Sequence, residues 1–107
     1  MAIYGYARVS TRDQTFSSQQ VQLADAGCQH VFSDTISGAR SQRPGLTQLF
    51  NELKPGDVIV VTRLDRLGRS VSDLIELMRE IERKGANLRS LAEAIDTTTM
   101  ARNQPMR

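Results

Sequence analysis

One hydroxyl and a group of arginines are the side chains of this sequence best suited to chemistry. Ser10 directly follows the apolar and aromatic stretch 3–9. Most arginines stand near junctions between predicted elements: Arg8, Arg12, Arg40, Arg43, Arg63, Arg66 and Arg69. A guanidinium is planar, permanently charged and able to bind two phosphate oxygens at once. Arginines gathered around one hydroxyl therefore favour phosphoryl transfer over acyl transfer.

The histidine content also argues against acyl transfer. That chemistry would need a histidine base beside the serine. His30 is the only histidine, and it stands at the start of the predicted second strand, away from that strand's carboxyl end. We therefore expect His30 to be structural or exposed.

The elements that must position these side chains alternate between strands and helices. Strands are predicted over residues 3–9, 31–34, 58–61 and 86–91. Helices are predicted over 18–26, 44–53 and 72–84. The run Val58–Val61 is apolar throughout, which is typical of a strand buried on both faces. This order predicts an α/β fold with a small parallel sheet of about four strands and helices on both faces.

Apolar spacing predicts which side of each helix is buried. Ser18 is expected to cap the first helix. That helix is expected to bury Val21, Leu23 and Ala24, and the second helix Leu46, Leu49, Phe50 and Leu53. The third helix is expected to bury Val71, Leu74, Ile75, Met78 and Ile81. Cys28 is interpreted as a core residue.

The predicted sheet brings the polar residues to one edge. In an open parallel sheet, ligands bind at the carboxyl ends of the strands, where the loops converge. The first strand would bring Arg8 and Ser10 to this edge, and the second strand Asp34. The third strand would bring the segment 63–69, which holds Asp65 and several arginines. We therefore expect the candidate site at this edge.

Three segments resemble signatures of the resolvase/invertase family of serine site-specific DNA recombinases. Residues 6–11, followed by Gln14, are similar to the segment around the nucleophile of that family. Residues 64–69 are similar to its second signature, and residues 34–46 to the mobile loop between the two. Their shared order and spacing carry more weight than any one segment alone. The resemblance implies a resolvase-like fold.

The resemblance also implies a reaction. Ser10 would attack a DNA phosphodiester, hold the 5′ phosphate covalently and release a 3′ hydroxyl. Arg8, Arg43, Arg66 and Arg69 would bind the scissile phosphate and stabilise charge in the transition state. The chain would thus be the catalytic domain of an enzyme that cleaves and rejoins DNA.

Other residues receive supporting roles from the same resemblance. Asp65 would orient arginines, and Gln14 and Gln20 would support the nucleophile loop. Asp34 would belong to the same network. Members of the family use no metal, so neither a metal nor a cofactor is expected.

The end of the sequence departs from the family pattern. Family members continue into a long helix that builds a homodimer and a synaptic tetramer, and then into a helix-turn-helix module. Here Pro105 opposes a helix. We assign 1–96 to the catalytic domain, expect a poorly ordered tail over 97–107, and expect the C-terminal DNA-binding domain to be absent. The chain alone is then expected to be inactive or weak.

Two other functions stay open. A truncated, non-catalytic fragment could pair with full-length recombinase and modulate it. A small phosphatase-like domain is disfavoured because the sequence has no cysteine nucleophile motif and no glycine-rich phosphate loop. A divalent metal bound beside Asp34 and Asp65 would revive that third reading.

Composition limits the remaining classes. The 107 residues suffice for one domain. A net charge of +2 permits an anionic partner such as DNA without requiring one. The sequence contains no apolar run long enough to cross a bilayer, no visible signal peptide and a single cysteine. We expect a cytoplasmic protein with neither a membrane partner nor a small-molecule substrate.

Overall fold

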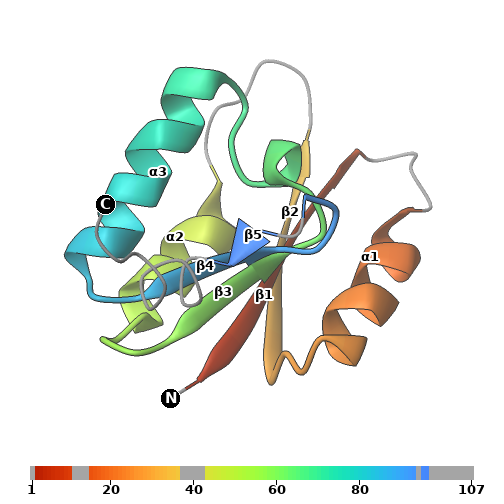
Figure 1. Cartoon of the computed structure of the whole chain (residues 1–107). Coiled ribbons are helices and arrows are strands. Elements are labelled where there is room, and N and C mark those ends of the chain that lie inside the picture. Colours follow the sequence, from red (N-terminus) through yellow and green to blue (C-terminus); the bar gives the residue numbers. More distant parts are fainter. Residues whose placement is uncertain (1, 11–14, 37–42, 94, 97–107) are drawn as a thin grey trace.

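Strands and helices alternate along the chain in the computed structural model, which describes residues 2–10, 15–36, 43–93 and 95–96 (Figure 1). The strands are β1 (Ile3–Ser10), β2 (His30–Ile36), β3 (Val58–Val61), β4 (Asn87–Ser90) and β5 (Ile95–Asp96). The helices are α1 (Thr15–Asp25), α2 (Pro44–Glu52), α3 (Val71–Arg83) and the short 3-10 helix η1 (Leu64–Arg66). None of the helices in these ranges is long and apolar enough to cross a membrane.

The strands form one sheet in the order β2-β1-β3-β4-β5. The first four strands of this order pair in parallel, which confirms the predicted sheet. β5 was not predicted, and it pairs antiparallel with β4. A strand of two residues has no hydrophobic period, so sequence patterns do not reveal it.

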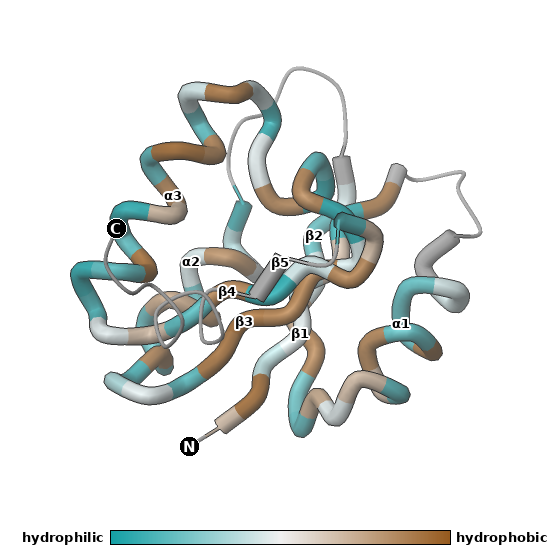
Figure 2. The backbone as a smooth tube through the Cα atoms, in the orientation of Figure 1, coloured by the Kyte–Doolittle hydropathy of each residue, from teal (hydrophilic) through white to brown (hydrophobic). Residues whose placement is uncertain are grey.

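Helices cover both faces of the sheet, as predicted. On one face, Tyr6 and Ile59 pack in a core with Leu49 of α2 and Ile81 of α3. On the other face, a smaller core gathers around Leu23 of α1. β3 is buried along its whole length and is uniformly apolar in Figure 2, because it contributes alternate side chains to the two cores.

The buried side of α1 differs from the prediction. The helix begins at Thr15, so Ser18 lies within it and is not its cap. Leu23 is fully buried, but Val21 is 60% exposed and Ala24 is exposed. Gln19 is buried four residues before Leu23, which places both on one side of the helix. A polar residue thus occupies a buried position on this helix.

The buried side of α3 is rotated relative to the prediction. Leu77 packs against the core together with Leu74 and Met78. Val71 and Ile75 are 75% and 44% exposed, so their predicted burial was wrong. At 100° per residue, Val71 and Ile75 lie about 90° and about 130° from the centre of a face between Leu74 and Leu77. The helix therefore presents two apolar side chains to solvent.

A matched pair of substitutions tests this placement. Leu49→Ala should lower the free energy of unfolding by about 2–5 kcal/mol, because Leu49 is fully buried and its removal leaves a cavity. Val71→Ala should change it by less than about 0.5 kcal/mol, because Val71 is exposed. Urea denaturation followed by circular dichroism measures both. Equal losses in the two variants would contradict the assigned core.

Candidate active site

The carboxyl ends of β1, β2 and β3 lie at one edge of the sheet (Figure 1). Ser10 is the last residue of β1, and its backbone pairs in register with Ile36 of β2. Two residues earlier, the carbonyl oxygen of Arg8 accepts a hydrogen bond from Nη1 of Arg66 at 3.2 Å. The loop after β3 therefore lies against the end of β1, as the sheet rule predicts.

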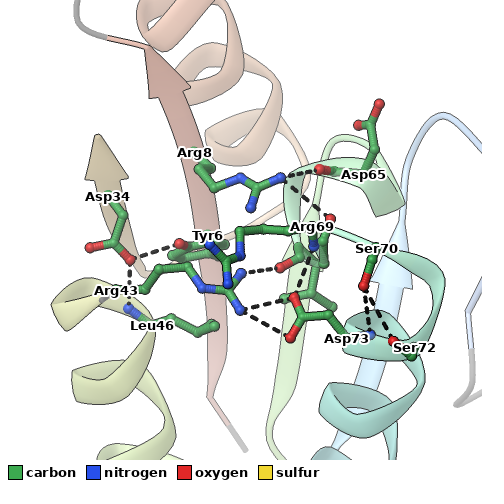
Figure 3. Close-up of polar contacts among 12 residues, drawn as sticks. Tyr6, Arg8, Asp34, Arg43, Leu46, Asp65, Arg69, Ser70, Ser72 and Asp73 are labelled. Atoms are coloured by element: carbon green, nitrogen blue, oxygen red, sulfur yellow. Dashed lines mark hydrogen bonds and ion pairs between the residues drawn. The ribbon is translucent and has the colours of Figure 1, made fainter. Parts of the chain in front are cut away.

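Arg8 is buried and donates to this loop in return. Its Nη2 donates to the carbonyl oxygens of Asp65, at 2.6 Å, and Gly68, at 3.3 Å (Figure 3). Its Nε and Nη1 are also buried, and neither has a hydrogen-bond partner among the described residues. Buried donors are normally paired, so two unpaired nitrogens mark a place suited to an acceptor.

Arg8, Arg43, Arg66 and Arg69 form what we call the arginine cluster. Burial lowers the pKa of Arg8, and the positive charges of Arg43, Arg66 and Arg69 lower it further. The Arg8 guanidinium thus lies among like charges. An anion bound among them would relieve the repulsion. The cluster therefore has the electrostatics of an oxyanion site.

Arg43 crosses from the start of α2 to the start of α3. Its Nη1 donates to the carbonyl oxygen of Leu67 at 2.7 Å. Its Nη2 donates to both carboxylate oxygens of Asp73, at 3.0 and 3.3 Å (Figure 3). Asp73 also accepts from the backbone N–H of Arg69 at 2.8 Å. One carboxylate thus holds two members of the arginine cluster.

Asp34 acts at a different point, by fixing the start of α2. It accepts from the hydroxyl of Tyr6 at 2.7 Å and from the N–H groups of Gly45, at 2.7 Å, and Leu46, at 3.0 Å. It therefore replaces a side-chain cap, which Arg43 at the N-cap position does not supply. Burial and the bond to Asp34 both raise the pKa of Tyr6, which keeps the hydroxyl protonated as a donor.

Glycine is required where α2 meets β2. A Cβ at Gly45 would lie 2.3 Å from the carbonyl oxygen of Ser33. Any larger residue would push the start of α2 away from Asp34. This close approach also sets where the backbone of Arg43 lies.

The side chains of the remaining predicted site residues have no described contact with the arginine cluster. The Asp65 carboxylate pairs with Arg63 at 2.8 Å, with both side chains more than half exposed, and only its backbone carbonyl contacts Arg8. Gln20 is exposed on α1, whereas its neighbour Gln19 is buried and donates to the carbonyl oxygen of Arg8 at 3.4 Å. Gln14 lies outside the described residues.

Sequence reasoning missed two residues of this network. One is Gln19, whose spacing of four from Leu23 could have placed it on the buried side of α1. The other is Asp73, which stands three residues after Ser70 in the pattern of a helix start. Ser70 is indeed the N-cap of α3 and accepts from the N–H of Asp73 at 3.1 Å.

A family model for the resolvase N-terminal domain matches residues 3–106. The chain belongs to this family. Serine recombinase gin of Escherichia phage Mu is 47% identical over 97 residues, which are 91% of this chain and 50% of the relative. DNA-invertase hin of Salmonella typhimurium is 46% identical over 99 residues, which are 92% of this chain and 52% of the relative. The chain thus spans about half the length of these relatives.

Solved structures agree with this membership. A resolvase family site-specific recombinase from Streptococcus pneumoniae has the same fold, with a TM-score of 0.75, 17% identity, and coverage of 92% of this chain and 76% of that one. The C-terminal catalytic domain of ISC1926 TnpA, an IS607-like serine recombinase, aligns with a TM-score of 0.69 at 25% identity, covering 85% of this chain and 67% of that one. The resolvase-like α/β fold predicted from the sequence is confirmed.

The titration of Asp73 predicts a pH dependence of stability. Burial raises the pKa of Asp73, but the hydrogen bond from Arg69 and the charge of Arg43 outweigh it, so the pKa lies below the ordinary value of 3.8. A carboxyl group with a depressed folded pKa stabilises the fold above its unfolded pKa. This stabilisation is lost as the pH falls through the lower folded value.

Asp73→Asn should therefore reduce stability at pH 7, and the difference from the unaltered chain should vanish below the folded pKa. Urea denaturation midpoints over a pH series measure this difference. Glu76→Gln, one turn later on the exposed side of α3, is the control and should show no comparable trend. A difference independent of pH would contradict the pairing.

Proposed function

We propose that this chain supplies the catalytic domain of a serine DNA recombinase, which cleaves and rejoins DNA through a 5′-phosphoserine at Ser10. Family membership supports the class of reaction. The observation that carries the residue assignment is the buried guanidinium of Arg8. Two of its nitrogens have no partner within the described ranges, and it lies two residues before Ser10. A phosphate bound there would supply the missing acceptors.

The proposed reaction is a phosphoryl transfer, in which one bond to phosphorus forms and another breaks. The hydroxyl oxygen of Ser10 would attack the phosphorus, and the bond from phosphorus to the 3′ oxygen would break. The Ser10 hydroxyl would lose its proton and the 3′ oxygen would gain one, so the step involves no net change in protons. Rejoining would be the reverse attack by a 3′ hydroxyl, which returns the free Ser10 hydroxyl. Because charge spreads over the non-bridging oxygens, Arg8, Arg43, Arg66 and Arg69 would contribute by electrostatic stabilisation, without a metal.

The supporting residues would act by fixing these arginines. Asp34 would hold the start of α2, through its bonds to Gly45 and Leu46, and so the backbone of Arg43. Gln19 would hold the carbonyl of Arg8 beside Arg66. Gln14, Gln20 and Asp65 keep the supporting roles that the family resemblance implies for them.

DNA is the proposed substrate. Two of the relatives are named for acting as a recombinase and an invertase, and they are about twice the length that this chain covers. Assembly into a homodimer and a synaptic tetramer, and action in the cytoplasm, are part of the same proposal. No cofactor is required by the reaction as proposed.

Covalent capture tests the proposed reaction. A DNA oligonucleotide with sulfur in place of the 3′ bridging oxygen has a better leaving group, so slow attack by Ser10 accumulates as a stable adduct. We expect a slowly formed adduct with the mass of the chain plus the downstream fragment, joined to Ser10 through its 5′ phosphate, and none for Ser10→Ala. Ser17→Ala, at an exposed serine of α1, should form it at the unaltered rate. Intact-mass spectrometry makes the measurement, and an adduct in Ser10→Ala would exclude the assigned nucleophile.

Binding to DNA should be weak, salt-sensitive and indifferent to sequence. The arginine cluster is suited to phosphate contacts, which carry no base information. Each neutralised phosphate releases counterions, so affinity should fall linearly on a double-logarithmic plot against salt. Fluorescence anisotropy with two duplexes of unrelated sequence, across a salt series, measures this. A large, salt-resistant preference for one duplex would show an additional base-reading element.

A further inference from the structure

Arg43 carries a positive charge that needs a carboxylate partner to stay within the arginine cluster. Arg43 lies next to Arg8 closely enough to lower its pKa, and Arg66 and Arg69 add to the same repulsion. Without a counter-charge, the long side chain of Arg43 would gain by turning to solvent. The groups that accept hydrogen bonds from Arg43 therefore decide whether its guanidinium stays in the cluster.

Other carboxylates near the cluster are engaged elsewhere. Asp34 accepts from Tyr6, Gly45 and Leu46, all neutral donors. Asp65 pairs with Arg63 at the surface. Within the described part of the chain, Asp73 is thus the carboxylate that forms an ion pair with a member of the cluster.

Asp73 is itself held rigidly. The Ser70 hydroxyl accepts from the N–H of Asp73 and so begins α3 at this point. In an ordinary capping box, the side chain of the third helical residue returns to the N-cap N–H. Here it accepts from the N–H of Arg69, one residue earlier, and keeps its carboxylate directed at Arg43. Figure 3 shows this carboxylate between α3 and the guanidinium of Arg43.

We propose that Asp73 is a positioning residue of the active site, which holds the guanidinium of Arg43 in place to receive the scissile phosphate. The inference rests on the proposed function and adds a residue to which the sequence assigned no role. The Arg43 side chain is 13% exposed and that of Asp73 is 25% exposed, so water screens the pair only in part. Because Nη1 of Arg43 donates to Leu67 while Nη2 donates to Asp73, the guanidinium is held at two nitrogens, which fixes its plane.

Asp73→Asn is the informative variant. An amide oxygen can still accept from the N–H of Arg69, so the start of α3 is retained, but the charge that holds Arg43 is lost. The capture experiment with the 3′-sulfur oligonucleotide is run on the full chain at saturating DNA. We expect the maximal capture rate to fall roughly tenfold and the Kd for DNA to change less than about threefold. That split arises because one ordered arginine acts mainly in the transition state, where a single lost donor costs on the order of 100-fold.

A double-mutant cycle shows whether Asp73 acts through Arg43. Arg43→Ala should lower the capture rate about 100-fold, and adding Asp73→Asn to it should lower the rate no further. Glu76→Gln is the matched control on α3 and should leave the rate unchanged. Thermal melting of each variant establishes that it is folded at the assay temperature.

Each outcome decides a separate point. An unchanged rate in Asp73→Asn, with a reduced rate in Arg43→Ala, overturns the role of Asp73 and leaves the proposed function standing. Independent, multiplying losses in the double variant overturn it as well, because Asp73 would then act by another route. Absence of any Ser10-dependent capture by the unaltered chain overturns the proposed function, and this inference with it.

Discussion

Repulsion between the buried guanidinium of Arg8 and its arginine neighbours is the constraint on which the rest of this site depends. Arginines that are proposed to surround one phosphate must stay close together without it, although their charges drive them apart. The chain meets this constraint mostly with backbone carbonyls. Asp65, Leu67 and Gly68 offer their carbonyl oxygens to Arg8 and Arg43. The loop that carries Arg66 and Arg69 is therefore also the acceptor for the other two arginines.

This arrangement explains why several residues near the site hold backbone segments in place. The carbonyls can accept only if the loop is held against the end of β1, and Arg66 does so by donating to the carbonyl of Arg8. Arg43 can reach the loop only if α2 starts close to β2, which Gly45 permits and Asp34 enforces. Acidic residues of the site are thus used to place backbone and cations, and their burial is balanced by donors.

Sequence patterns predicted the parts of the molecule that follow local rules. The apolar run of β3 and the stripe of α2 that ends at Leu53 required only their own periodicity. The rotation of α1 and α3 depends on what lies beneath them, so Val21 and Val71 were misplaced. The family signatures identified the arginines because those residues are contiguous with recognisable motifs.

The missed residues are those whose contacts cross the fold. Gln19 is polar, so only its spacing from Leu23 indicates burial, and its amide donates to a carbonyl eleven residues away in sequence. The pairing of Asp73 with Arg43 joins positions thirty residues apart. Asp65 was expected to orient arginines, and its described contact with Arg8 is made by its backbone carbonyl. A motif can indicate that a residue lies near a site. Which of its atoms makes the contact depends on the tertiary structure.

The contact at Gly68 has a mechanical consequence. A Cβ at this position would lie 2.7 Å from both Cα and Cβ of Leu74, so the loop backbone rests directly on the first turn of α3 without an intervening side chain. Packed interiors transmit displacement because they contain little free volume. The loop and the start of α3 therefore behave as one stiff body, with a contact surface of backbone against backbone. A tilt of α3 would therefore press on the loop that carries Arg66 and Arg69, and the Gly68 carbonyl would pass it on to Arg8.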